Sequence, residues 1–96
     1  MQRVLRSVAL EELEAARIWY DEQSAGLGAE FVDAAVAAIG HVAQAPAAFP
    51  QVHRSIRRLL MRRFPYAIFY HMTATEIVIL GVMHLRRDPR HWQSRS

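Results

Sequence analysis

The sequence predicts an α+β fold in the order β-α-α-β-β-β, in which a helical hairpin packs on one face of a small antiparallel sheet. Three observations lead to this class. Apolar residues recur with helical spacing through the first half of the chain, and with strand-like alternation after Pro50. The third is length: because 96 residues suffice for one small domain but not for two, we expect a single domain spanning residues 1–96.

The first half of the chain divides into a short strand and two helices. Residues 4–8 are β-compatible. Residues 9–23 place apolar side chains at i, i+4, i+7 and i+11 on one face, and the glycine-containing residues 24–28 end this helix. A second helix is expected over residues 29–44, because apolar side chains recur there with the same helical period and Pro46 and Pro50 follow. The short connection predicts an antiparallel hairpin.

Three β-type segments follow Pro50, at residues 56–63, 66–72 and 77–85. They are rich in Ile, Val, Phe and Tyr, and their short connections predict an antiparallel meander. The last segment is apolar on both faces, so we expect it to be central in the sheet. Alternation along it predicts Ile77, Ile79, Gly81 and Met83 on one face, and Val78, Leu80, Val82 and His84 on the other. The face away from the hairpin should stay partly open and carry the Arg-rich strands.

Charge is distributed unevenly along the chain. All twelve basic residues are Arg. Residues 1–50 hold three of them and seven acidic residues, whereas residues 51–96 hold nine and only two acidic residues. A compositional bias of the genome would explain Arg in place of Lys, but it does not explain this segregation. The basic half therefore indicates an anionic partner.

Several functional classes are excluded by composition. The sequence has no Cys, so it has no disulfide framework, no thiolate metal site and no Cys nucleophile. The five His residues lack the zinc spacings H-x-x-x-H and H-E-x-x-H. The longest apolar run, Ile77 to Met83, is far shorter than the roughly 18–20 residues of a membrane span, and no signal-peptide pattern opens the chain. We expect a cytoplasmic protein without metal, cofactor or membrane association.

Two segments of the second half form a recognisable pair. Residues 57–70 read RRLLMRRFPYAIFY, and residues 77–92 read IVILGVMHLRRDPRHW. They resemble the RR-x(n)-FPY-x-I-x-Y region and the V-x-H-x-RRDP-x-x-W ending of the RelE/ParE toxin family. Trp19-Tyr20 and residues 26–31 fit the same pattern. The resemblance spans nearly the whole chain, and it implies the toxin half of a bacterial type II toxin–antitoxin pair in the ParE and plasmid-stabilisation branch.

The resemblance implies one of two activities. ParE-like members inhibit DNA gyrase, whereas RelE-like members are mRNA endonucleases that act on the ribosome; both are neutralised by a cognate antitoxin, here expected from the adjacent gene. RNA cleavage needs a general base, a general acid and cations at the phosphate. The chain has no Lys and no Tyr after Tyr70, which favours a growth-inhibiting, non-enzymatic gyrase inhibitor. The alternative is a ribosome-dependent endonuclease that uses His84 or His91 as the acid or base, with Arg62, Arg86 and Arg87 on the phosphate.

The candidate target-binding residues come from the basic half. They are Arg57, Arg58, Arg62, Arg63, Arg86, Arg87, Arg90 and Trp92. Each has a structural interpretation beside the functional one, because arginines on edge strands also prevent aggregation and Asp88 can hold an Arg in a bidentate pair. His84 can hydrogen-bond backbone at the strand end. The aromatic residues Trp19, Tyr20 and Trp92 are interpreted as core or hairpin anchors. A third possibility, a simple nucleic-acid-binding module, is the weakest, since the helices carry the acidic residues.

Overall fold

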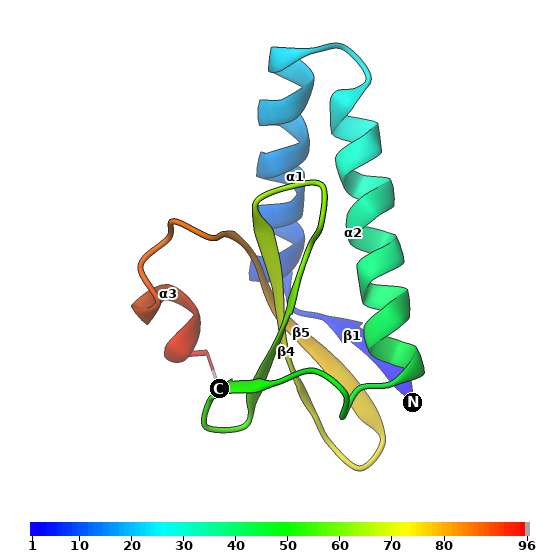
Figure 1. Cartoon of the computed structure of the whole chain (residues 1–96), viewed down its shortest axis with the longest axis vertical. Coiled ribbons are helices and arrows are strands. Elements are labelled where there is room, and N and C mark those ends of the chain that lie inside the picture. The colour runs from blue at the N-terminus through cyan, green and yellow to red at the C-terminus, as the bar shows by residue number, and fades with distance from the viewer. Residues whose placement is uncertain (96) are drawn as a thin grey trace.

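The computed structural model describes residues 1–95 and contains a helical hairpin, one five-stranded sheet and a short C-terminal helix (Figure 1). The strands lie in the spatial order β1-β5-β4-β3-β2. The elements are β1 Gln2–Leu5, α1 Ser7–Gln23, α2 Leu27–Gln44, β2 Gln51–His53, β3 Ile56–Leu60, β4 Tyr66–Met72, β5 Glu76–His84 and α3 Arg90–Gln93.

The α+β class, the helical hairpin and the antiparallel meander of β3, β4 and β5 are confirmed. β5 is central, between β1 and β4. Two short elements, β2 and α3, were not predicted. β1 pairs with β5 in the parallel direction, with Gln2 opposite Glu76 and Leu5 opposite Ile79, so the sheet is mixed. The two strands come from opposite ends of the chain, and no local pattern specifies the direction in which they pair.

The hairpin connection depends on two glycines. Gly26 adopts a left-handed backbone with φ of 89°, which glycine enters without steric cost. The Asp21 carboxylate accepts hydrogen bonds from the N–H groups of Gly26 and Gly28, at 3.1 and 3.0 Å. A Cβ atom at Gly28 would lie 2.4 Å from the backbone oxygen of Arg17. The helices therefore approach closely only because residue 28 has no side chain.

A β-bulge interrupts β5 and changes the facing of its side chains. The register passes from Phe69 opposite Gly81 to Tyr70 opposite Ile79, so one residue of β5 has no counterpart on β4. An extra residue shifts the alternation by one position. Ile77, Ile79 and Val82 consequently lie in the helix-side core, and Val78, Leu80 and Met83 lie on the opposite face. The strict alternation predicted for this strand is therefore wrong beyond the bulge.

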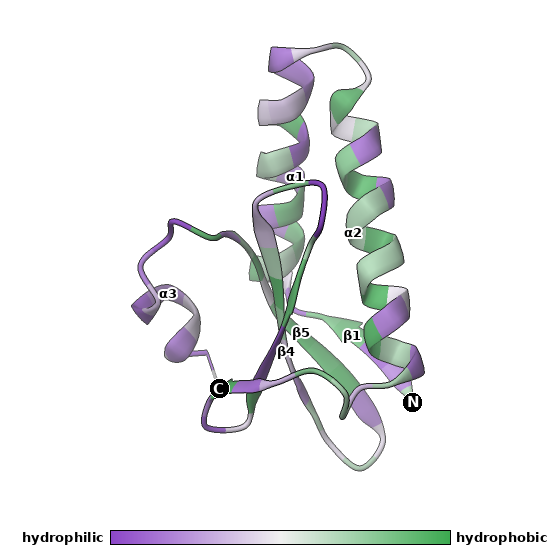
Figure 2. Cartoon of the chain, in the orientation of Figure 1, coloured by the Kyte–Doolittle hydropathy of each residue, from purple (hydrophilic) through white to green (hydrophobic). Residues whose placement is uncertain are grey.

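Two apolar cores cover the two faces of the sheet. The larger core lies under the hairpin, and Tyr20, Phe31 and Phe64 form an aromatic cluster in it with ring centroids 4.9–5.2 Å apart. The second core is centred on Phe69 and Trp92, which stack at 4.4 Å. Hydrophobic residues concentrate in β4 and β5, and hydrophilic ones in the segment around α3 (Figure 2).

The second core corrects the expectation of a partly open face. The C-terminal segment folds back over the sheet, and Trp92 supplies its large apolar side chain, 7% exposed. Tyr20 is likewise buried, as expected of an anchor. Trp19, interpreted in the same way, is 55% exposed, so for this residue the interpretation as a core anchor is wrong.

Candidate functional site

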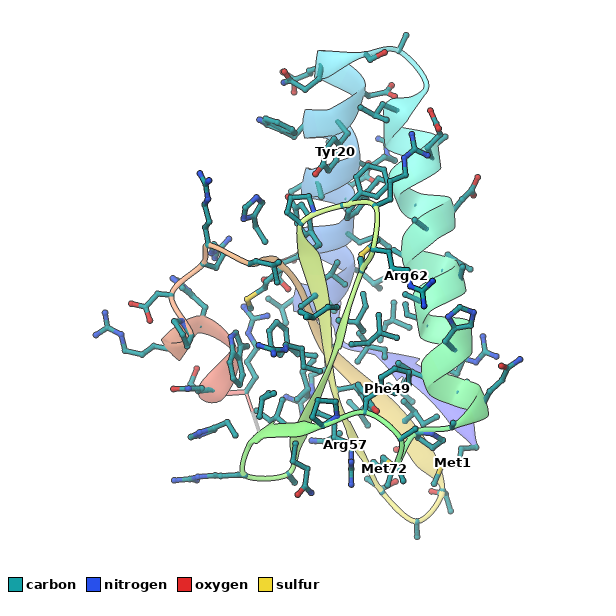
Figure 3. The ribbon with its side chains drawn as sticks, in the orientation of Figure 1. Met1, Tyr20, Phe49, Arg57, Arg62 and Met72 are labelled. Carbon is teal, nitrogen blue, oxygen red and sulfur yellow. The ribbon has the colours of Figure 1, made fainter. Side chains whose placement is uncertain are left out.

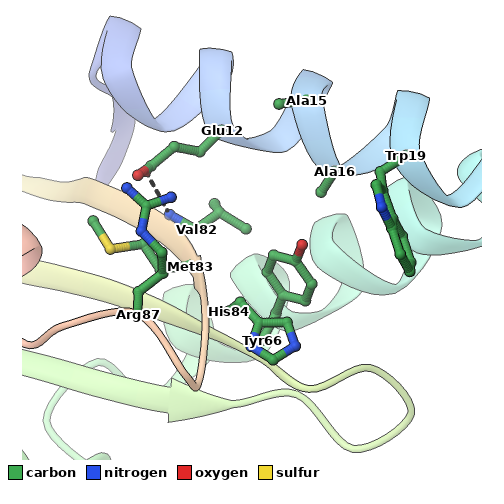
Figure 4. A pocket seen from close by; sticks show the side chains of 9 residues that line it. All are labelled: Glu12, Ala15, Ala16, Trp19, Tyr66, Val82, Met83, His84 and Arg87. Carbon is green, nitrogen blue, oxygen red and sulfur yellow. Dashed lines mark hydrogen bonds between the residues drawn. The ribbon is translucent and has the colours of Figure 1, made fainter.

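A small cleft lies between α1 and the end of β5 (Figure 4). Its volume is about 260 Å³. The lining residues are Glu12, Ala15, Ala16, Trp19, Tyr66, Val82, Met83, His84 and Arg87. The bulge in β5 helps to form it, because the shifted alternation places His84 on the helix side of the sheet, opposite Tyr66.

Glu12 lines one end of the cleft, and its Oε1 is engaged there. Its Oε1 accepts a hydrogen bond from the backbone N–H of Val82 at 3.1 Å. The same oxygen lies 2.9 Å from Nη1 of Arg95, which also donates to the carbonyl oxygen of Leu80 at 3.2 Å. The Glu12 and Arg95 side chains are only 13% and 17% exposed. Because the charge of Glu12 is paired with Arg95 and its Oε1 accepts two hydrogen bonds, Glu12 is poorly placed to act as a general base.

His84 is held in one tautomer. Its Nδ1 accepts a hydrogen bond from the backbone N–H of Arg86 at 3.0 Å, and its ring lies edge-on to Tyr66 at 5.2 Å. Nδ1 is therefore unprotonated, and the proton of the neutral ring is on Nε2. In this tautomer Nε2 is available as a hydrogen-bond donor and does not accept a proton. Base catalysis at Nε2 would require the other tautomer and the loss of the contact with Arg86.

Two aromatic residues complete the cleft. Burial raises the pKa of the Tyr66 phenol, and the nearby Arg87 opposes this shift by a smaller amount. The hydroxyl of Tyr66 is thus a protonated donor at neutral pH. Trp19 packs edge-on against Tyr20, with ring centroids 5.1 Å apart, and leaves about half of its surface in solvent.

The residues predicted for catalysis do not form one site. His84 and Arg87 both line the cleft. Arg86 is exposed and acts on His84 through its backbone N–H. Arg62 lies beside α2, where it lines a separate groove (Figure 3). The structure therefore assembles one imidazole and one guanidinium, without the additional cation expected at a phosphate.

Two arginines of β3, Arg57 and Arg58, are half-buried. Arg57 Nη1 donates to the carbonyl oxygens of Phe49 at 2.6 Å and Ala47 at 3.2 Å, and so holds the segment between α2 and β2 (Figure 3). The Nε of Arg58 is buried and has no hydrogen-bond partner among residues 1–95. Arg57 therefore has a structural role in this fold, which was one of the two interpretations of the Arg-rich segment.

The C-terminal candidates also have internal partners. Arg90 forms an ion pair with Asp88, in which Nη2 and Nε both donate to Oδ2, at 2.6 and 3.0 Å. This is the structural role that the sequence suggested for Asp88, and the pairing lowers the pKa of its carboxyl group. Trp92 is stacked on Phe69, so its indole is committed to the second core rather than to a partner.

A larger groove runs between α2 and β3. Its volume is about 580 Å³, and Leu60, 50% exposed, is part of its apolar wall. Arg62 and Arg63 stand at its rim, and Arg63 also pairs with Glu30 at 2.8 Å. The lining residues are Ala34, Ala37, Ala38, His41, Phe49, Leu59, Leu60, Met61, Arg62 and Arg63. It shares no residue with the cleft.

Sequence reasoning missed two members of the cleft. Trp19 lies next to the apolar stripe of residues 9, 13, 16 and 20 but does not belong to it. A large aromatic residue outside the buried stripe was the available signal that Trp19 lies at the surface. Tyr66 was predicted only as the first residue of the β-type segment at residues 66–72. Its pairing with His84 depends on the bulge, for which the sequence holds no clear signal beyond Gly81.

The fold and these two concave surfaces define a small α+β protein with a basic rim on an apolar groove. Among residues 1–95, no group of three potential ligand side chains is placed to hold a metal, and no helix has the length and hydropathy needed to cross a membrane. The family model described as the ParE toxin of the type II toxin–antitoxin system parDE matches residues 4–89. The chain therefore belongs to the ParE toxin family.

The structural comparison agrees in fold. A solved structure of the chromosomal ParDE toxin–antitoxin system from P. aeruginosa superposes with a TM-score of 0.79, covering 88% of this chain and 95% of that chain at 20% identity. No curated protein matches the chain. The resemblance to the toxins of type II toxin–antitoxin systems is thus confirmed, in the ParE branch.

Proposed function

We propose that this toxin inhibits growth by binding DNA gyrase, without catalysing a reaction of its own, and that a cognate antitoxin encoded by the adjacent gene neutralises it. Its place of action is then the cytoplasm. One observation carries the choice against RNA cleavage. The groups expected to supply a general base and a second cation are engaged or apart: Glu12 is paired with Arg95, Nδ1 of His84 is bonded to the backbone N–H of Arg86, and Arg62 lies in another groove.

The groove between α2 and β3 is the surface that fits the antitoxin. Its wall is apolar and includes the exposed Leu60, which suits the apolar face of an amphipathic helix. Arg62 and Arg63 at the rim favour a helix that carries carboxylates beside that face. Covering this groove would remove apolar surface from water, so the free toxin should be less soluble than the complex.

Among the other candidate arginines, Arg86 and Arg87 are proposed as target contacts. Arg86 and Arg87 are exposed and form no ion pair with any residue between 1 and 95. Positive charge there suits an acidic surface on the target, where it would raise the association rate as well as the affinity. Arg57 and Trp92 are left out of this set, because their side chains are engaged inside the protein.

Two assays test this function together. Purified toxin should inhibit the supercoiling activity of purified gyrase, and expression should cause filamentation and a DNA-damage response while translated mRNA stays intact. Arg86→Glu combined with Arg87→Glu should abolish both effects. Primer extension on a translated message tests the endonuclease alternative. Discrete ribosome-dependent cuts that disappear in His84→Ala would show that the toxin is an mRNA endonuclease and overturn the proposal.

A further inference from the structure

The cleft between α1 and β5 has the composition of a protein-binding hot spot. We propose that it is the surface on which this toxin engages its target, and that it takes a segment of the target carrying a carboxylate beside an apolar side chain. The inference rests on the proposed function in one respect, namely that the toxin acts by binding a protein. It adds the location of the contact and the chemistry of the partner.

Three side chains at the cleft mouth are of the types that dominate binding energy at protein interfaces. They are Trp19, Tyr66 and Arg87. Trp19 is 55% exposed, an unusual fraction for the largest side chain in a domain with two well-filled cores. Its ring is steadied on one side by Tyr20, so little conformational entropy would be lost on binding.

The polar groups of the cleft match an anion. The Tyr66 hydroxyl, the Nε2–H of His84 and the Arg87 guanidinium are hydrogen-bond donors. The one carboxylate of the lining, that of Glu12, is paired with Arg95, and its Oε1 also accepts from the N–H of Val82. A carboxylate entering the cleft would therefore meet donors and positive charge, with the negative charge of Glu12 compensated.

Size and surroundings point to protein side chains. A volume of about 260 Å³ is below the roughly 300–1,000 Å³ of sites that enclose a drug-sized ligand, so the cleft admits one or two side chains. Ala16, Val82 and Met83 supply an apolar lining for the neighbour of the carboxylate.

The cleft and the α2–β3 groove have no residue in common and lie on different elements. Substitutions in one should therefore leave the other intact. This separation gives the inference a sharp consequence: variants of the cleft should lose target binding and toxicity while they still bind the antitoxin.

Binding of purified gyrase to the full-length toxin tests the inference, with Trp19→Ala and Arg87→Gln as variants. Ile18→Ala is the matched control, since Ile18 is 46% exposed on the same helix but does not line the cleft. We expect Trp19→Ala to weaken binding by about 30-fold or more, as for a hot-spot residue, and Ile18→Ala by less than about threefold. Melting temperatures measured alongside should show that the variants remain folded.

The outcomes separate the cleft from the identity of the target. If folded Trp19→Ala and Arg87→Gln bind gyrase as the unmodified toxin does, the inference is wrong. If the unmodified toxin does not bind gyrase, but Trp19→Ala loses toxicity in cells and Ile18→Ala keeps it, gyrase is the wrong target and the cleft is supported. If a fluorescent single-stranded oligonucleotide binds the unmodified toxin but not the Trp19→Ala variant, the cleft binds nucleic acid, and the proposal of a protein partner is wrong.

Discussion

Nη1 of Arg95 lies 2.9 Å from Oε1 of Glu12, which joins the C-terminal segment to the first helix. The pair also continues the sheet. β1 ends at Leu5, so the following part of β5 has no neighbouring strand on that side. There the backbone N–H of Val82 donates to Glu12, and the carbonyl oxygen of Leu80 accepts from Arg95. Two side chains thus replace a neighbouring strand at the bulge, and they hold the C-terminal segment that covers the second core.

Removing either partner of this pair should destabilise the fold. Arg95→Ala leaves a mostly buried carboxylate unpaired, so we expect the free energy of unfolding to fall by about 1–3 kcal/mol. Glu12→Gln should cost less than Glu12→Ala, because the amide oxygen still accepts from Val82. Denaturant unfolding of the single and double variants measures this. Additive effects in the double variant would contradict a direct interaction.

Two glycines of α2 should respond in opposite directions to the same substitution. Gly28→Ala forces a Cβ to within 2.4 Å of the Arg17 backbone oxygen, and we expect a loss of about 1–3 kcal/mol. A Cβ at Gly40 meets no atom within 4 Å, so Gly40→Ala should stabilise the helix by about 0.5–1 kcal/mol. Thermal or denaturant unfolding compares them, and equal effects of the two changes would contradict the close helix approach at Gly28.

Stability should decrease as the pH falls below about 6.5, the usual pKa of an unfolded histidine. Burial, and to a lesser degree the charge of Arg6, lowers the pKa of His71 in the folded protein. The unfolded state then binds more protons in this window, so stability rises with pH there and is lost as the pH falls. Urea midpoints between pH 7.5 and 5.5 measure the slope. His71→Gln should flatten it, and an unchanged slope would show that His71 is not the source.

Charge reversal at the groove rim should weaken antitoxin binding. Arg62→Glu with Arg63→Glu should raise the Kd for the adjacent-gene product by about 10–100-fold at low salt, because acidic side chains of the antitoxin would then be repelled. The effect should shrink at high salt, where exposed charges are screened. Arg86→Glu is the control, since Arg86 does not line the groove. Calorimetric titration distinguishes the two, and equal losses would point to a nonspecific charge effect.

Periodicity alone located most elements of this protein. The apolar stripes predicted both helices to within two residues of their observed starts, and the alternation in residues 66–72 predicted the bounds of β4. The FPY and H-x-RRDP-x-x-W segments identified the family that the comparisons confirm. These features are local, because each depends on neighbours within a few turns of helix or one strand.

The candidate site depended on contacts that no local pattern contains. The bulge in β5 is set by pairing with β4, and it alone turns His84 toward Tyr66 and the first helix. In the sequence, Arg95 is one more positive charge in a basic tail. Its pairing with Glu12 depends on the fold, which brings the two residues together. The sequence by itself determined the helices, the meander and the family; the tertiary structure decided which face each side chain of β5 occupies and which arginines are free. The physical reason is that a shift of one residue in strand register reverses every side chain beyond it, and register is decided by partners distant in the chain.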